Sequence, residues 1–271
     1  MRPLHSFMPA RNARYFARLL LLLVIVVWST SAAAAPVSVR YSEGIVRGFL
    51  VLQSTDGALV ASGDFLQVKQ ENGEVETRTV FYFKDGSLFD ETVRFTQKNS
   101  FTMQSYRLVH KGPAFKQDMS ATLERASGKY RVVVKPHGKA EKVYEGKFDF
   151  PSDLYNGMIP IIAKNLREGG GESVHLVAFT PAPRVIGLDL VPSGKNKVMV
   201  GAIEKSVLHY VLKPKLGVGL KIPAALLGRL PPDNHLWVMT SEVPAFVRFE
   251  GPLYPEGPVW QIELTSPRWV K

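Results

Sequence analysis

The chain has 271 residues, of which 45% are hydrophobic, and it carries 34 lysines and arginines against 24 aspartates and glutamates, with no cysteine. This composition is typical of a folded globular protein and excludes an intrinsically disordered chain, disulfides and thiolate metal sites. The formal charge of +10 would suit a nucleic-acid-binding protein. Four arginines precede residue 19, however, and without them 30 basic residues face 24 acidic ones, which leaves +6.

The amino terminus shows the three regions of a secretory signal peptide. Residues 1–18 contain four arginines and no acid, residues 19–28 are an unbroken apolar run, and residues 29–35 are small and rich in alanine. The apolar run is shorter than the roughly 20 residues that a spanning helix needs. The pattern therefore predicts a cleaved signal peptide over residues 1–34, in preference to an uncleaved anchor, and a single β-rich domain over residues 35–271. We expect a periplasmic or extracellular bacterial protein.

The first half of the expected domain has the pattern of antiparallel strands separated by tight turns. Asn-Gly at 72–73 and Asp-Gly at 85–86 supply the positive φ angles that hairpin turns require. Strand-like runs follow at 75–84, 89–96, 101–110, 119–126 and 130–135. In the second run every other residue forms one mostly apolar face, which consists of Phe89, Glu91, Val93 and Phe95. This order predicts a β meander.

A helix is expected over residues 152–168. Pro-Ser-Asp at 151–153 is a helix-start signal, apolar residues then recur at helical spacing, and three glycines at 169–171 end the run. Pro160 should kink this helix or split it. A second short helix is expected at 221–230.

Strands resume in the second half, where the chain becomes richer in proline and tryptophan. The expected strands cover 172–179, 184–191, 197–203, 207–213, 235–240, 245–249 and 259–264, with a turn at 193–196. The fold class is therefore mostly β: a large curved antiparallel sheet, an open barrel or a sandwich, with one or two short helices. Lysine-rich strands and the proline-rich tail are expected to protect the sheet edges.

The residues that could carry chemistry form few recognisable patterns. The closest two histidines after residue 34 are 26 positions apart, and no compact metal motif occurs, so we predict no metal site and no cofactor. Asp233 and His235 share a strand face and are the weak catalytic candidates of a hydrolase-type alternative. The simpler interpretation is an Asp–His hydrogen bond that orders a turn.

The apolar helix is the one positive signal for a ligand. A sheet that curls around such a helix can enclose an apolar cavity for a lipid or another apolar small molecule. Its lining would be Tyr155, Met158, Ile162, Trp237 and Phe246. The alternative is that the helix fills the sheet and completes the core.

Charge is unevenly distributed along the chain. Residues 98–147 hold 11 basic against 4 acidic residues and residues 195–229 hold 7 against 1, whereas residues 43–91 hold 9 acids against 4 bases. A second alternative is therefore a basic module that binds an anionic membrane surface or a partner protein. No nucleic-acid partner is expected, because no recognised binding motif is present.

The tail carries a resemblance to a known group. Its residues include Pro-Pro-Asp-Asn-His-Leu-Trp at 231–237, Glu-Gly-Pro-Leu-Tyr at 250–254 and Gly-Pro-Val-Trp at 257–260. These resemble the carboxyl-terminal signature of a family of exported bacterial β-rich proteins with a domain of unknown function. More loosely, the whole chain is similar to the half-barrels of periplasmic lipoprotein carriers. That likeness is architectural and implies no catalytic residues.

The leading hypothesis is a non-enzymatic, exported bacterial envelope protein that binds a lipid or other apolar ligand in a curved β-sheet.

Overall fold

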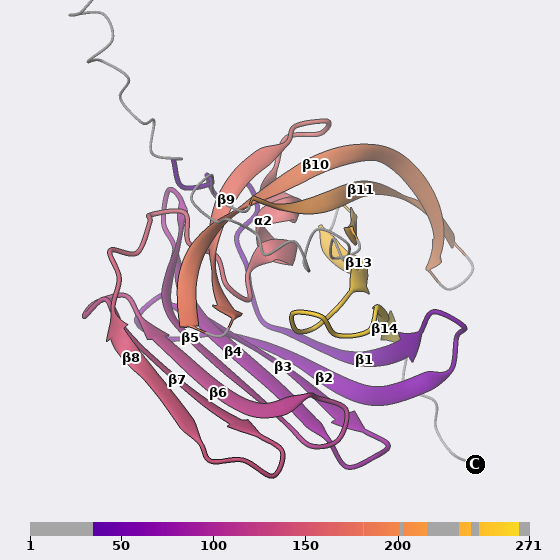
Figure 1. The fold of residues 1–271 in the computed structure, drawn as a ribbon. Helices are drawn as coiled ribbons and strands as arrows, with labels where there is room; N and C mark the ends of the chain where they lie inside the picture. The colour runs from indigo at the N-terminus through magenta and orange to yellow at the C-terminus, as the bar shows by residue number, and fades with distance from the viewer. Residues whose placement is uncertain (1–34, 181, 201–202, 216–232, 240–243, 266–271) are drawn as a thin grey trace, which may run out of the picture. The chain divides into compact units, whose positions relative to one another are not determined.

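The computed structural model describes residues 35–180, 182–200, 203–215, 233–239 and 244–265 (Figure 1). The expected signal peptide at 1–34 and the expected helix at 221–230 lie outside these residues. Ala34–Lys271 is one compact unit. Across the described ranges, no helix is long and apolar enough to cross a membrane.

The protein is mostly β: strands account for 64% of the described residues and form one curved, 14-stranded antiparallel sheet that does not close into a barrel (Figure 1). This confirms the expected fold class in its open form. The strands are β1 (Val46–Ser54), β2 (Leu59–Lys69), β3 (Val75–Phe83), β4 (Leu88–Gln97), β5 (Phe101–Lys111), β6 (Gln117–Glu124), β7 (Lys129–Pro136), β8 (Lys142–Lys147), β9 (Glu172–Thr180), β10 (Ala182–Val200), β11 (Ile203–Lys215), β12 (Asn234–Met239), β13 (Ala245–Gly251) and β14 (Trp260–Thr265).

Two meanders meet in the middle of the sheet. The strand order runs from β8 back to β1, continues with β14 and then runs back to β9. The proline-rich tail therefore occupies the centre of the sheet, where β14 pairs with β1, and the expectation that it protects an edge was wrong. Local sequence could not show this, because the pairing joins strands from the two ends of the domain.

The turn expected at 193–196 does not occur, because β10 is continuous through these residues. The register with β11 shifts between Pro192 and Gly194, and Gly194 adopts a φ of 115°. The same glycine-containing stretch that signals a turn has produced a β-bulge within a strand.

The helix is shorter than expected. In the described part of the chain it is α2 (Ile159–Asn165), and residues 152–158 form turns instead. Pro160 lies in the first turn of α2 and neither kinks nor splits it. Proline lacks a backbone N–H, and the N–H groups of the first turn of a helix have no acceptor within the helix. Pro160 therefore fits the start of α2.

The two edge strands, β8 and β9, are consecutive along the chain and are joined by a segment that contains α2. This segment covers the free edge of β9: the N–H of Tyr155 donates to the carbonyl of His175, and the N–H of His175 donates to the carbonyl of Asp153. The side-chain amide of Asn156 exchanges two further bonds with the backbone of Val177. The edge at β8 is exposed and carries Lys142 and Lys147, as expected for a charged edge.

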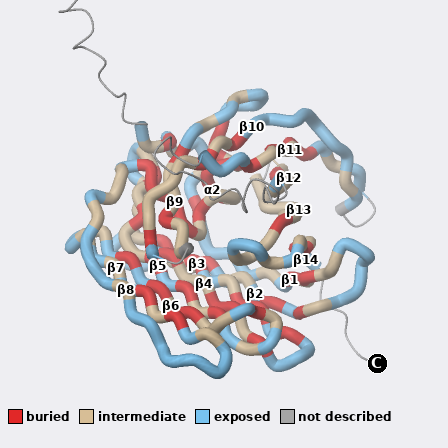
Figure 2. Tube along the Cα trace, viewed as in Figure 1, coloured by how far each residue is buried: buried red, intermediate tan, exposed pale blue. Residues whose placement is uncertain are grey.

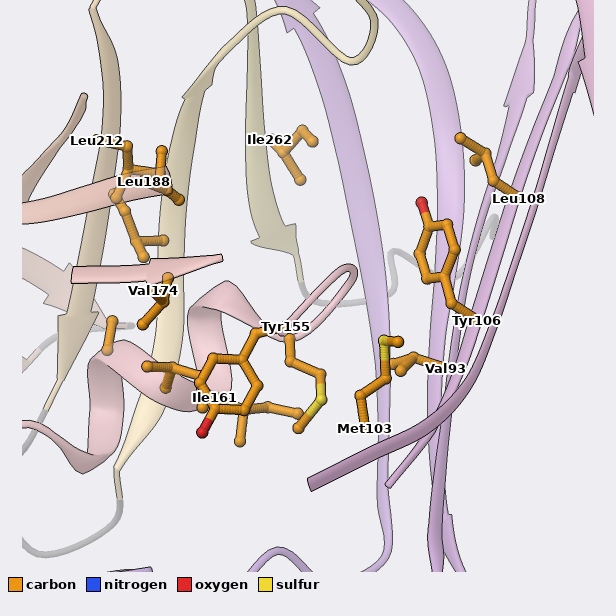
Figure 3. Packing of buried hydrophobic residues seen from close by; sticks show 14 of the residues in the cluster. Val93, Met103, Tyr106, Leu108, Tyr155, Ile161, Val174, Leu188, Leu212 and Ile262 are labelled. Atoms are coloured by element: carbon orange, nitrogen blue, oxygen red, sulfur yellow. The ribbon is translucent and has the colours of Figure 1, made fainter. Parts of the chain in front are cut away.

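The core lies on the concave side of the sheet, where α2 packs (Figures 1 and 2). Figure 3 shows Tyr155 and Ile161 of the connecting segment between strand residues of the two meanders. Tyr155 is fully buried, and its hydroxyl accepts a bond from the N–H of Val37 and donates to the carbonyl of Phe101. Burial raises the pKa of Tyr155 to about 12. The segment thus joins both meanders and the amino-terminal residues into one core.

Candidate functional site

An ionisable side chain, Glu91, faces the apolar concave side of the sheet. On β4 it shares this face with Phe89 and Val93, both buried, and it lies directly opposite Leu108 of β5. The hydroxyl of Tyr106 donates to its Oε1 at 2.8 Å. Burial raises the pKa of the Glu91 carboxyl, although the bond from Tyr106 opposes this, and burial also raises the pKa of Tyr106.

The preceding residue has different hydrogen-bond partners. Asp90 lies on the convex face and is only 7% exposed, the guanidinium of Arg78 donates to both of its oxygens at 2.9 Å, and Arg107 lies 3.5 Å away. The hydrogen bond with Arg78 holds the pKa of Asp90 below its ordinary value. One carboxylate is therefore paired with cations on the convex face, whereas Glu91 is hydrogen-bonded by a neutral hydroxyl on the concave face. Carboxyls whose pKa is raised by burial are enriched at functional sites.

Concave residues around Glu91 are only partly covered. Thr79 lies opposite Glu91 and Phe65 lies opposite Thr79 in the register, and both are half-buried, as is Glu91 itself. In the other meander Phe246 and Phe249 lie opposite the fully buried Val238 and Leu236, so they also face the core, yet both keep accessible surface. Glu91 and several aromatic residues of the concave side therefore keep part of their surface accessible.

Glu91 also lies close to the backbone of the segment that joins β8 to β9. A Cβ on Gly157, which has a φ of 71°, would lie 3.4 Å from the carboxyl carbon of Glu91 and 3.2 Å from the ring of Tyr106. The ring of Phe179 stacks on Tyr106 with centroids 6.1 Å apart. Strand β9 and this segment therefore hold the Tyr106 side of the pair in place.

The five expected lining residues do not share one space. Tyr155, Met158 and Ile162 have no exposed surface and form part of the core. Trp237 faces away from the core, because it alternates with the buried Leu236 and Val238 on β12. Phe246 is the one of the five that is both concave and half-buried. The structure therefore places the helix residues in the alternative role that the sequence also allowed, that of completing the core.

His235, the weak catalytic candidate, has another imidazole as its neighbour. Its Nδ1 lies 2.9 Å from Nε2 of His209, and the rings of both histidines stack near Trp237. Asp233 is exposed and lies just before β12. The hydrolase alternative that joins Asp233 to His235 stays a prediction.

Two surface hollows of about 430 and 540 Å³ lie away from Glu91. The smaller one borders Ser173 and Asp189, and the larger one lies between residues 35–40 and 165–172. The hydroxyl of Ser173 donates to Asp189 and accepts a bond from Lys215, whose ammonium is also ion-paired with Asp189 at 2.7 Å. A charged, paired lysine cannot act as the base for this serine, so the cluster is a surface ion pair.

The two basic blocks belong to opposite ends of the strand order. Residues 98–147 cover β5 to β8, and the described part of the second block covers β10 and β11. Several lysines of the second block form ion pairs, among them Lys195 with Glu168 and Lys197 with Glu204. Ion pairing therefore reduces the free positive charge of the second block.

Glu91 was visible in the sequence as the one acid on an otherwise apolar strand face, but its hydrogen bond with Tyr106 depends on the register of β4 and β5. Comparison of the chain with protein-family models, curated proteins and solved structures found no match in any of the three.

Proposed function

We propose that this protein is a non-enzymatic, exported bacterial envelope protein that binds an apolar ligand on the concave face of its sheet. The observation that carries the proposal is the half-buried carboxyl of Glu91, which the buried Tyr106 hydroxyl contacts, on a concave face that also bears half-buried aromatic residues. Export is supported by the signal-peptide pattern of residues 1–34.

Glu91 has no clear advantage for folding. Burying a carboxyl costs free energy, and a neutral hydroxyl offsets less of this cost than a cation does. A leucine or threonine at this concave position would pack with Phe89 and Val93 without that cost. A polar group that is unfavourable for stability and accessible to a small molecule is better explained by ligand recognition.

The ligand chemistry follows from the half-buried residues of the concave side. Phe65, Phe246 and Phe249 offer apolar surface, and the carboxyl group offers a hydrogen-bond acceptor. The ligand class is therefore an amphiphile or other apolar molecule that carries one hydrogen-bond donor, such as a hydroxyl, amide or ammonium group. An architecture like that of lipoprotein carriers agrees with this class.

Replacing Glu91 by leucine should weaken binding of such a ligand. With N-phenyl-1-naphthylamine, an apolar fluorophore with a single N–H donor, we expect E91L to raise the Kd about five- to tenfold, which corresponds to the loss of one hydrogen bond. The control is E76L, because Glu76 faces outward on the neighbouring β3. Fluorescence titration of the purified protein measures both values.

A second measurement separates a binding role from a structural one. E91L alone would leave the buried hydroxyl of Tyr106 without its acceptor, so the stability test uses the double variant E91L/Y106F, which removes both partners and should unfold at the same temperature as the parent protein or at a higher one. Native mass spectrometry of the parent should show a bound apolar molecule. An E91L variant that binds the fluorophore as tightly as the parent, together with a reproducibly empty protein, would contradict the proposal.

The long β10–β11 hairpin favours a second candidate function, docking on an anionic membrane. Among the residues that the structure describes, β9 pairs with β10 as far as Leu190 and β12 pairs with β11 from Leu208, so residues 196–200 and 203–207 form a two-stranded ribbon beyond these pairings. Near its tip Met199 and Ile203 are 64% and 60% exposed. Exposed apolar residues at the tip of a lysine-bearing ribbon fit a lipid surface.

This candidate predicts binding to phosphatidylglycerol vesicles in a flotation assay. The double variant M199D/I203D should lose binding, because the aspartates remove the apolar contact and are repelled by the anionic headgroups. The control is Y82D, which changes an exposed apolar residue of β3. Equal loss in both variants, or retention that is unchanged at high salt, would count against membrane docking.

A further inference from the structure

Two imidazoles meet on the convex face of the second meander. In the register of β11 and β12, His209 lies opposite Trp237 and His235 lies opposite Val211, so the two histidines are diagonal neighbours. Both are half-buried and face away from the core, since they alternate with the buried Leu208, Tyr210 and Leu236. Nε2 of His209 and Nδ1 of His235 are 2.9 Å apart. Regular strands fix both backbones, so the separation does not depend on a loop.

We propose that these two nitrogens bind a divalent transition-metal ion, with Cu²⁺ as the preferred ion. An imidazole nitrogen binds such ions at about 2.0–2.1 Å. Two nitrogens 2.9 Å apart can both reach one ion, and the angle between the two bonds is then about 90°. This is the angle between adjacent ligands in the square-planar and octahedral geometries of Cu²⁺ and Ni²⁺, and Cu²⁺ binds most tightly in the divalent series. A tetrahedral ion would need the nitrogens about 3.3 Å apart.

Metal binding at the two nitrogens requires no other residue to accept or donate a proton. At this distance one of the two nitrogens carries a hydrogen and the other accepts it. When the ion binds, that hydrogen moves to the distal nitrogen of its own ring, Nδ1 of His209 or Nε2 of His235, and both rings remain neutral ligands.

The surrounding charges tolerate a cation. The guanidinium of Arg248 lies over the ring of Trp237, but it is ion-paired with Glu250 at 3.0 Å and with Glu263 at 3.4 Å. These three groups carry a net charge of −1. Glu250 lies opposite His235 in the register of β12 and β13, so its negative charge is close to the imidazole pair. The two histidines provide the protein ligands, and solvent completes the coordination.

The indole of Trp237 makes the site observable. Its ring is nearly parallel to that of His209, with centroids 4.5 Å apart and an angle of 3°. Because Cu²⁺ quenches nearby indoles, titration of the purified protein with CuCl₂ in a non-coordinating buffer should give a saturable loss of tryptophan emission. The W237F variant should lose most of this signal and still bind Cu²⁺ by calorimetry.

The matched variants are H209Q and H235Q, with H137Q as the control on an exposed histidine of the first meander. Each of the first two should weaken Cu²⁺ binding about tenfold or more, since one of two joined ligands is lost, and H137Q should not. The double variant H209Q/H235Q reports binding elsewhere, for example at the amino terminus. An unchanged Cu²⁺ affinity in H209Q and H235Q, or equal saturation of the double variant, would overturn the proposal.

Discussion

Replacing Ile162 by alanine should lower the free energy of unfolding by about 2–5 kcal/mol. Ile162 lies on α2, has no exposed surface, and belongs to the core that both meanders share. The helix is only seven residues long, so its own hydrogen bonds contribute little and its stability depends on packing against β12 and β13. Loss of two methyl groups and one methylene group would leave a cavity. The hydrogen-bonded strands around α2 cannot move far enough to fill it. Urea unfolding at pH 7 measures the change.

The control for this prediction is M199A, which shortens an exposed side chain on β10. We expect that variant to stay within about 0.5 kcal/mol of the parent. A loss below about 1 kcal/mol in I162A would mean that α2 is not part of the cooperative core. In that case the helix would be free to move, and the cavity-lining role first considered for Ile162 would regain support.

The meander of the first half could be predicted because its signals are local. Turn dipeptides at 72–73 and 85–86 and the alternation at 89–96 determine neighbouring strands directly, and β3 and β4 form there as hairpin-linked strands. The pairing of β1 with β14 has no local signal, since it joins residues 206 to 216 positions apart through burial of a shared face. Likewise, glycine at 194 favours a turn and a bulge equally, and only the partner strand β11 decides between them.

The candidate sites likewise depend partly on local sequence signals and partly on the pairing of distant strands. Glu91 stands out in the sequence as an acid on an apolar face, but its partner Tyr106 is 15 positions away and is brought to it by the bulge-adjusted register of β4 and β5. His209 and His235 are 26 positions apart, which argued against a metal site from spacing alone. Antiparallel pairing across a long connection makes such spacing uninformative, because the register of the two strands sets the distance.

The structure also separates two surfaces that a single ligand hypothesis had combined. Phe246 belongs to the concave side with Glu91, whereas Trp237 belongs to the convex side with the imidazole pair. A change at one surface should therefore leave the other intact: E91L should not alter Cu²⁺ quenching of Trp237, and H209Q should not alter binding of the apolar fluorophore.

Acidification from pH 6.5 to pH 4 should destabilise the fold by about 3 kcal/mol through one buried histidine, His110. It is 4% exposed and stacks on Phe115 with ring centroids 4.6 Å apart, in an aromatic cluster with Tyr254 and Trp260. Burial lowers the pKa of His110 from 6.5 to about 4, and the carboxylate of Asp118 opposes this only in part. Between pH 6.5 and pH 4, His110 is therefore mostly protonated in the unfolded chain and mostly neutral in the folded protein. The stabilisation is complete above pH 6.5 and is lost as the pH falls through the folded pKa.

The variant that tests this is H110F, because phenylalanine keeps the stacking on Phe115 and removes the titration. The free energy of unfolding in urea, measured at several pH values for both proteins, should show a difference that changes by about 3 kcal/mol between pH 6.5 and pH 4. Glu91 acts with the opposite sign, since its raised pKa means that stability is lost as the pH rises above its unfolded value. Its contribution is the same in both proteins and cancels in the difference. Parallel curves for the two proteins would show that His110 is protonated as readily in the folded state as in the unfolded chain.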